Sequence, residues 1–262
     1  MEDDRLADSH VLVTGAARGI GAGIARRVAR AGADVSIFDT RPGTAEETAA
    51  QVRDSGGEAA IFDVDVSSEA AIADGLDGAV SELGPIGGLV NNAGVQRAIP
   101  ILETTEEDWD FHMNVNAKGT FLVSKAVAGH MVDEGTNGAI VNVASTAAVR
   151  AFPGQGAYAA SKAGVVAFTK VLAKELGDHG ITANAINPGT VDTPMVQEWL
   201  EEHAAESDRA EAEVLDDALE SHTLDRMGRP EEIGHVAVLL LSKEGEWITG
   251  EAINVDAGYT SE

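Results

Sequence analysis

The 262-residue sequence contains no cysteine, and this absence excludes disulfide bonds and thiolate metal sites. It also contains no apolar run close to the ~20 residues that a membrane-spanning helix requires. The first ten residues are acidic and polar, unlike a signal peptide or a transit peptide. We therefore expect a cytoplasmic protein with no membrane partner.

Basic residues are also scarce, at 18 against 44 acidic residues, so the formal net charge is −26. Such a surface repels nucleic acid, which is bound through a basic footprint. Only six of the basic residues are lysines. This composition favours a cytoplasm at molar salt, where the Debye length falls to ~3 Å and surface carboxylates repel one another weakly. We expect a halophilic protein, with an ordinary acidic mesophilic enzyme as the alternative.

Short β-branched runs alternate with segments of helical spacing along the whole chain. This alternation predicts a parallel sheet covered by helices on both faces. Hydrophobic residues make up 44% of the sequence, which is enough for a sizeable core. We expect one α/β domain over residues 1–262, a Rossmann-like, doubly wound parallel sheet of about seven strands.

A glycine-rich turn follows the first expected strand, residues 10–14, and precedes a helical segment. Gly15 permits a tight turn, and Gly19 lets a pyrophosphate approach the backbone. Gly21 allows close packing, and the N-terminus of the helix would face the anion. The turn therefore predicts a dinucleotide phosphate site.

Asp39 ends the second expected strand, where a carboxylate can accept hydrogen bonds from ribose hydroxyls and repel a 2′-phosphate. This position favours NAD over NADP. Arg18 and Arg41 argue the other way, because a nearby arginine can accommodate that phosphate. Asp65, after the third strand, is placed to accept from the adenine amino group, or else to cap a helix.

Residues 91–94, Asn-Asn-Ala-Gly, end the fourth expected strand. Ligands of open α/β sheets bind at that edge, although a purely structural latch is the alternative. Asn116 and Gly119 lie inside a helical segment, residues 105–132, where both are poor helix formers. They predict a kink with a backbone carbonyl freed to hold water.

Tyr158 and Lys162 are four residues apart in a strong helical segment, so they share a helix face. A nearby ammonium lowers the pKa of a phenol, which starts near ~10. Such a phenol can give or take a proton. Ser145 follows the fifth expected strand and could donate to a substrate oxygen beside the phenol.

Residues 191–226 form a long excursion, with ten acids and one arginine between residues 198 and 220. Its sparse apolar positions predict one or two short amphipathic helices. A long excursion at a cleft favours a lid over the substrate, with an exposed acidic insertion as the alternative.

These motifs occur together in one order and spacing that resembles the short-chain dehydrogenases/reductases, of the single-domain type, over essentially the full chain. The matching positions are Thr14, Gly15, Gly19, Gly21, Asn91, Asn92, Ala93, Gly94, Asn116, Ser145, Tyr158, Lys162, Asn187, Pro188 and Gly189. One departure is Asp256-Ala257-Gly258, where a Gly-Gly pair is frequent in the family.

The resemblance implies that Tyr158 is the general acid/base, that Lys162 lowers its pKa and holds the nicotinamide ribose, and that Ser145 polarises the substrate carbonyl. Asn116 would keep a water in a proton relay, and no metal would be needed. Cofactor contacts would come from Gly15, Arg18, Gly19, Ile20, Gly21, Asp39, Asp65, Val66, Asn92, Ala93, Gly94, Tyr158, Lys162, Pro188, Val191 and Thr193. The family also implies a homotetramer.

The substrate is indicated less directly. Gln96, Arg150, Gln155 and Met195 are candidates for the cleft beside Ser145 and Tyr158, and Arg150 could instead face solvent. The amides and the guanidinium favour a sugar, polyol or keto sugar acid, and an aromatic content of 4% argues against a broad aromatic pocket. Alternatives are an NADP-linked carbonyl or 3-ketoacyl-thioester reductase and a non-catalytic nucleotide-binding sensor.

Overall fold

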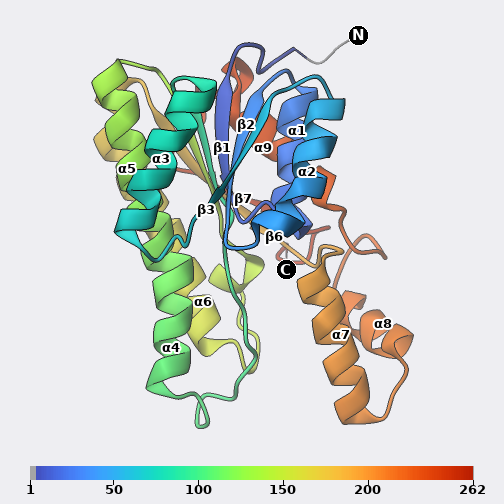
Figure 1. Cartoon of the computed structure of the whole chain (residues 1–262). Helices are drawn as coiled ribbons and strands as arrows, with labels where there is room; N and C mark the ends of the chain where they lie inside the picture. The colour runs from blue at the N-terminus through green and yellow to red at the C-terminus, as the bar shows by residue number, and fades with distance from the viewer. Residues whose placement is uncertain (1–3, 262) are drawn as a thin grey trace.

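A computed structural model describes residues 4–261; residues 1–3 and 262, the ends of the expected domain, lie outside the described residues. It contains a seven-stranded parallel sheet in the order β3-β2-β1-β4-β5-β6-β7 (Figure 1). The strands are β1 His10–Thr14, β2 Asp34–Asp39, β3 Ala59–Asp63, β4 Gly88–Asn91, β5 Ala139–Val143, β6 Thr182–Pro188 and β7 Ala252–Val255. The expected Rossmann-like, doubly wound fold is confirmed.

Helices cover both faces of this sheet. Helices α1, α2 and α9 pack together on one face, and α3, α5 and α6 lie on the other (Figure 1). The helices are α1 Gly19–Arg30, α2 Pro42–Asp54, α3 Glu69–Leu83, α4 Glu106–His112, α5 Thr120–Glu134, α6 Gly156–Leu176, α7 Pro194–Ser207, α8 Glu211–Leu219 and α9 Pro230–Leu241. No helix within residues 4–261 is long and apolar enough to cross a membrane.

The core is divided between the two faces because side chains of a strand alternate in direction. In β1, Val11 and Val13 join the cluster beneath α1 and α9, whereas Leu12 joins the cluster beneath α3 and α5. Every residue of β1 is therefore buried. This explains why the strand is a continuous apolar run rather than an alternating pattern.

The expected kink between residues 105 and 132 is a π-helical segment, Met113–Gly119, which separates α4 from α5. Gly119 is required there, because a Cβ atom would lie 2.8 Å from Cγ2 of Val66. Insertions of this kind are frequent at functional sites.

The excursion after β6 forms two helices, α7 and α8, which pack on each other and extend away from the sheet (Figure 1). Leu200, Ala204 and Val214 make a small apolar cluster of their own between these helices. The base of the excursion is closed where the Asp192 N–H donates to the Gly228 carbonyl at 2.8 Å. The prediction of short amphipathic helices is therefore confirmed.

Candidate active site

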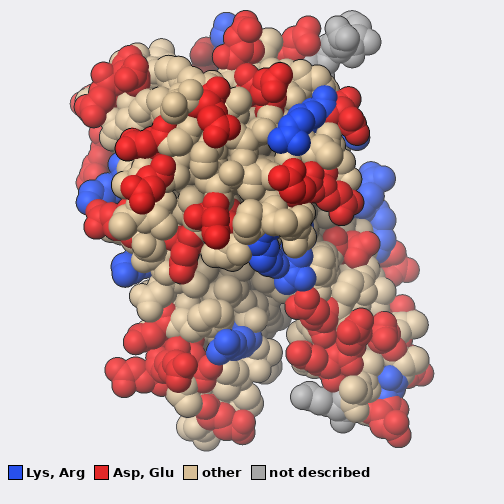
Figure 2. Space-filling view, viewed as in Figure 1, with Lys and Arg blue, Asp and Glu red and all other residues tan. Residues whose placement is uncertain are grey.

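A cavity of about 860 Å³ lies at the carboxyl ends of the strands. The surface is hollowed between the part that contains α4 and the part that contains α7 and α8 (Figure 2). Most of the expected site residues line it: Gly15, Arg18, Gly19, Ile20, Asp39, Asp65, Val66, Asn92, Ala93, Gly94, Gln96, Ser145, Gln155, Tyr158, Lys162, Pro188, Val191, Thr193 and Met195. Gly21, Asn116 and Arg150 do not line it.

The glycine turn forms one wall of this cavity. Gly15 and Gly19 have φ angles of 66° and 61°, in the left-handed region that favours glycine. A Cβ atom on Gly21 would lie 2.3 Å from the Gly15 carbonyl oxygen, so this residue sets the packing of α1 against the turn. The N-terminus of α1 thereby faces an open backbone cradle, which fits a dinucleotide pyrophosphate.

Asp39 is buried at the end of β2, and its carboxylate orders the surrounding backbone. Its Oδ2 accepts the Ala17 N–H at 2.9 Å, and its Oδ1 accepts the Arg41 N–H at 3.1 Å. The Arg41 Nε also lies 3.2 Å from Oδ1. The carboxylate and the guanidinium therefore stand side by side at one end of the cavity.

Asp65 orders the turn before α3 but does not cap that helix. Its Oδ1 accepts from both the N–H and the hydroxyl of Ser67, at 2.8 and 2.7 Å. Ser68, not Asp65, caps α3, because its Oγ accepts the Ala71 N–H. Asp65 still lines the cavity with its neighbour Val66.

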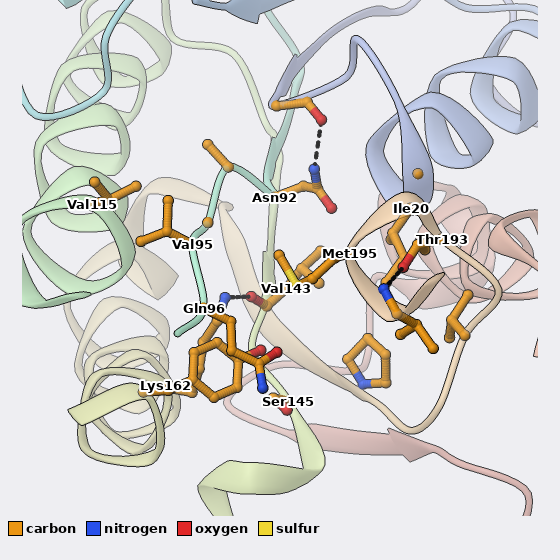
Figure 3. Close-up of a pocket in the computed structure, with 18 of the residues that line it drawn as sticks. Ile20, Asn92, Val95, Gln96, Val115, Val143, Ser145, Lys162, Thr193 and Met195 are labelled. Atoms are coloured by element: carbon orange, nitrogen blue, oxygen red, sulfur yellow. Dashed lines mark hydrogen bonds between the residues drawn. The ribbon is translucent and has the colours of Figure 1, made fainter. Parts of the chain in front are cut away.

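Two asparagines at the end of β4, Asn91 and Asn92, link this strand to neighbouring segments. Asn91 donates to Ser124 and to the Asn142 side chain, at 2.9 and 2.8 Å. Asn92 donates to the carbonyl oxygens of Thr14 and Gly15, at 3.0 and 2.9 Å. Both side chains therefore act as structural latches, while the chain from Asn92 onward borders the cavity (Figure 3).

Ser145, Tyr158 and Lys162 meet at the opposite end from Asp39. Ser145 follows β5, its Oγ accepts the Ala147 N–H at 3.1 Å, and it also hydrogen-bonds the Tyr158 hydroxyl. The Lys162 Nζ lies 5.9 Å from the centre of the Tyr158 ring. Figure 3 shows Ser145, Lys162 and Gln96 gathered in this part of the cavity.

The pKa of Tyr158 differs from the sequence-based expectation. Burial of the phenol raises its pKa, and the hydrogen bond from Ser145 opposes this effect. Burial also lowers the pKa of Lys162 to about 8. Burial, and not the charge of Lys162, therefore sets the direction of the Tyr158 pKa in the free protein, contrary to the expected lowering.

Asn116 lies behind the cavity, in the π-helical segment. Its side chain pairs with both backbone groups of Val95, at 2.8 and 2.9 Å, and donates to Ser161. Its carbonyl oxygen accepts the Thr120 hydroxyl at 2.7 Å. This bond uses one of the two acceptor positions of the backbone carbonyl oxygen, so the water relay at Asn116 stays a prediction. The side-chain contacts of Asn116 hold the chain after β4 in place.

Arg150 is placed elsewhere than expected. Its guanidinium donates to the backbone carbonyl oxygen of Tyr259 at 2.5 Å and lies 4.2 Å from the centre of the Tyr259 ring. Arg150 therefore holds the C-terminal segment rather than lining the cavity. Its partner is 109 residues away in the chain, so local sequence gave no signal of this contact.

Aromatic side chains contribute more to the cavity than their number suggested. Residues from well-separated segments line it, namely Phe38, Phe111, Phe152, Tyr158, Trp199 and Tyr259. Phe38 precedes Asp39 in β2, whereas the other five rings come from separate segments of the chain, so a low aromatic content does not prevent several rings from lining the same cavity. Arg97, Glu198 and Ala218 are further lining residues that the sequence analysis missed.

A glycine cradle at a helix N-terminus, a carboxylate at the end of β2 and a serine–tyrosine–lysine cluster together define a dinucleotide-binding oxidoreductase of the Rossmann-like class. Comparison with known proteins agrees. The family model described as enoyl-(acyl carrier protein) reductase matches residues 15–260. The chain belongs to the short-chain dehydrogenase/reductase family. It is an oxidoreductase that uses a nicotinamide cofactor and acts on CH–OH groups or the corresponding carbonyls.

Three similar proteins illustrate this relationship. The short-chain reductase protein NovJ of Streptomyces niveus is 40% identical, over 96% of this chain and 94% of its own. The D-threitol dehydrogenase of Mycolicibacterium smegmatis is also 40% identical, over 98% and 95%. The crystal structure of a short-chain type dehydrogenase/reductase from Mycobacterium marinum matches with a TM-score of 0.91 at 32% identity, over 99% of each chain.

Proposed function

We propose that the protein transfers a hydride between NAD and a secondary alcohol or ketone that belongs to the sugars, polyols or keto sugar acids. The observation that carries this proposal is a single cavity with Asp39 at one end and Ser145, Tyr158 and Lys162 at the other. The cavity thus joins a position suited to an adenosine ribose to a position suited to proton transfer.

The residues present fit a dinucleotide. The turn that contains Gly15 and Gly19 would hold the pyrophosphate, and Asp39 would accept the ribose hydroxyls. The adenine and nicotinamide ends would be held by the remaining lining residues, namely Arg18, Ile20, Asp65, Val66, Asn92, Ala93, Gly94, Tyr158, Lys162, Pro188, Val191 and Thr193. Gly21 shapes this wall by close packing alone. When bound, the nicotinamide ring supplies the hydride acceptor.

The reacting proton is handled by the protein. In oxidation, the Tyr158 phenolate takes the proton from the substrate hydroxyl, and the Ser145 hydroxyl donates a hydrogen bond to the oxygen that becomes the carbonyl. The charge of Lys162 favours the phenolate and opposes the burial that raises its pKa. Asn116 keeps the neighbouring chain in position. Reduction is the reverse sequence.

The substrate end combines amides with flat rings. Gln96 and Gln155 line it, and Phe152 and Trp199 add apolar surface. A small polyhydroxylated molecule would hydrogen-bond the amides while its carbon-bound hydrogens pack on the rings. The D-threitol dehydrogenase relative supports this substrate class. Arg150 is not part of this proposal, because it holds Tyr259 instead.

The test is a panel of sugars, polyols and sugar acids with NAD, followed by the absorbance of the reduced cofactor in molar salt. At least one member is expected to be oxidised. Replacement of Tyr158 by Phe should lower kcat by about 10²–10⁴-fold, because proton transfer is lost. Unchanged turnover of the best substrate by Y158F would refute the catalytic assignment.

An NADP-linked carbonyl or acyl-thioester reductase is the second candidate. The observation in its favour is Arg41, whose side chain is 45% exposed beside Asp39 and lines the cavity. A guanidinium there could pair with a 2′-phosphate. The buried carboxylate opposes this by charge, which is why NAD is preferred.

We also propose that residues 1–262 form one domain and that residues 191–226 act as a substrate lid. Support for the lid is the ion pair between Arg18 in the glycine turn and Glu198 on α7, whose charged atoms are 2.9 Å apart. A halophilic, cytoplasmic homotetramer without nucleic-acid or membrane partners remains our proposal for its setting. The net charge of −26 supports the halophilic character and the absence of a nucleic-acid partner.

A further inference from the structure

His112 is a buried histidine that the proposed mechanism does not use. It ends α4, is 1% exposed and does not line the cavity. Its Nε2 accepts the backbone N–H of Arg97 at 3.0 Å. Its Nδ1 lies 2.7 Å from the Asp108 carbonyl oxygen, so this nitrogen is the donor. Both ring nitrogens are therefore committed to backbone groups.

The same imidazole also contacts the candidate acid/base. Its ring meets the Tyr158 ring edge to face, with centres 6.4 Å apart and an angle of 71° between the planes. Such pairs favour one relative orientation of the two rings. One side chain thus touches the phenol and holds the backbone of residue 97.

Residues 95–97 are held from several directions. The Arg97 guanidinium lies 4.2 Å from the centre of the Phe111 ring and 3.3 Å from Oδ1 of Asp108. Farther along, the Ile99 N–H donates to the Gly154 carbonyl at 2.8 Å, next to Gln155. The segment therefore lies between α4 and the loop that leads to Tyr158. Within it, Gln96 lines the substrate end of the cavity.

We propose that His112 is a positioning residue, which fixes residues 95–97, and with them Gln96, relative to the Tyr158 phenol. Without the Nε2 acceptor, the Arg97 N–H loses its partner and the segment can shift. A displacement of this kind reduces the rate because the substrate and the reacting groups are no longer aligned. The inference rests on the proposed roles of Tyr158 and Gln96.

Two variants separate the two contacts of His112. Replacement by Phe keeps a ring against Tyr158 but removes both ring nitrogens, and with them the acceptor for the Arg97 N–H and the donor to Asp108. Replacement by Gln supplies an acceptor without the ring. His130 provides a matched control, because its Nε2 accepts the Ile86 N–H at 3.2 Å, before β4 and so at the other end of the sheet. H130F removes the same kind of hydrogen bond far from the cavity.

Two measurements are made on each variant as the full chain. Hydrogen–deuterium exchange of peptides covering residues 95–104 needs no substrate. Steady-state kinetics use the best alcohol of the panel at saturating NAD. For H112F we expect faster exchange and a KM raised about five- to tenfold, as for one lost hydrogen bond, with NAD affinity unchanged. H112Q should recover both values to within about twofold, and H130F should change neither.

Three results would overturn the proposal. The first is an exchange rate and a KM in H112F that match the wild type. The second is an H112Q variant whose exchange rate and KM change as much as those of H112F. The third is a rise in KM in H130F as large as that in H112F. If no alcohol in the panel is oxidised, the proposed function fails, but the exchange measurement still decides whether His112 orders residues 95–97.

Discussion

The Lys162 ammonium donates a 2.8 Å hydrogen bond to the carbonyl oxygen of Val143, the last residue of β5. This bond fixes a buried cation at the carboxyl end of the sheet, next to Tyr158. A charge removed from water in this way destabilises the fold unless it is compensated. The lysine is therefore expected to favour activity at the expense of stability.

Replacement of Lys162 by Met tests whether this lysine lowers stability while it supports activity. The lowering of its pKa from 10.5 to about 8 means that burying the charged form lowers the free energy of unfolding by about 3 kcal/mol at pH 7. Met removes this penalty but also removes the hydrogen bond to Val143, which contributes about 1 kcal/mol of stability. K162M should therefore be at least as stable as wild type in urea at pH 7, while turnover falls at least about 100-fold.

The pH dependence of this difference has a definite sign. Between pH 8 and 10.5 the unfolded chain binds more protons at Lys162 than the folded chain, so wild-type stability rises with pH in that window. The difference in the free energy of unfolding between K162M and the wild type should therefore become smaller between these pH values. A gap that stays constant from pH 7 to 10.5 would contradict the assigned cause.

The Tyr158 pKa can be measured directly, because the chain contains only two tyrosines. In a Y259F background, the ultraviolet absorbance of tyrosinate reports Tyr158 alone. Its midpoint in the free protein should lie above 10.0, and S145A should raise it further by removing the hydrogen bond that lowers it. Since the folded state then holds the proton longer, this group lowers stability as pH rises above 10.0. A midpoint below that value would show that the charge of Lys162 outweighs the burial of the phenol.

Replacement of Asp39 by Ala tests the cofactor preference. Removal of the carboxylate eliminates its repulsion of a 2′-phosphate and releases Arg41 from its ion pair. The ratio of kcat/KM with NAD to that with NADP should fall by about 10-fold or more, as for a loss of about 1.4 kcal/mol. An unchanged ratio in D39A would show that Asp39 does not select NAD and would count against the proposed cofactor.

Gly21 can be compared with Gly43, which is also helical. A Cβ atom on Gly21 would meet backbone at 2.3 Å, whereas nothing lies within 4 Å of one on Gly43. G21A should lower the free energy of unfolding by about 1–3 kcal/mol and weaken NAD binding. G43A should be neutral or slightly stabilising. Equal unfolding curves for the two variants would contradict the packing argument.

Salt provides a test of the proposed halophilic character. With 44 acidic and 18 basic residues, mutual repulsion should destabilise the fold at low ionic strength. The thermal midpoint should rise steeply from low to molar KCl. A flat response would favour the ordinary acidic enzyme.

Much of the fold was predictable because its signals are local. The β1 run is apolar because both faces are covered, and Gly15 and Gly19 mark a turn with positive φ. Tyr158 and Lys162 are close together because helical spacing requires it. These features depend on residues within a few positions of each other.

The remaining features depend on contacts between distant segments. Arg150 reaches Tyr259, and the cavity gathers Phe111, Phe152 and Trp199 from separate elements. The direction of the Tyr158 pKa depends on burial, which no spacing rule provides. Sequence therefore identified the chemical groups but not the surroundings that tune them.

The π-helical segment Met113–Gly119 also makes the chain sensitive to its length. It follows His112 directly and contains Asn116, whose side chain holds Val95. A π-helical turn closes i→i+5 hydrogen bonds and so holds one residue more than an α-helical turn; loss of a single codon in this segment would therefore favour one regular α-helix in place of α4 and α5. Point substitutions in these seven residues keep the spacing of His112 and Asn116, whose side chains hold the chain after β4. A one-residue deletion between them would change the relative direction of these two side chains.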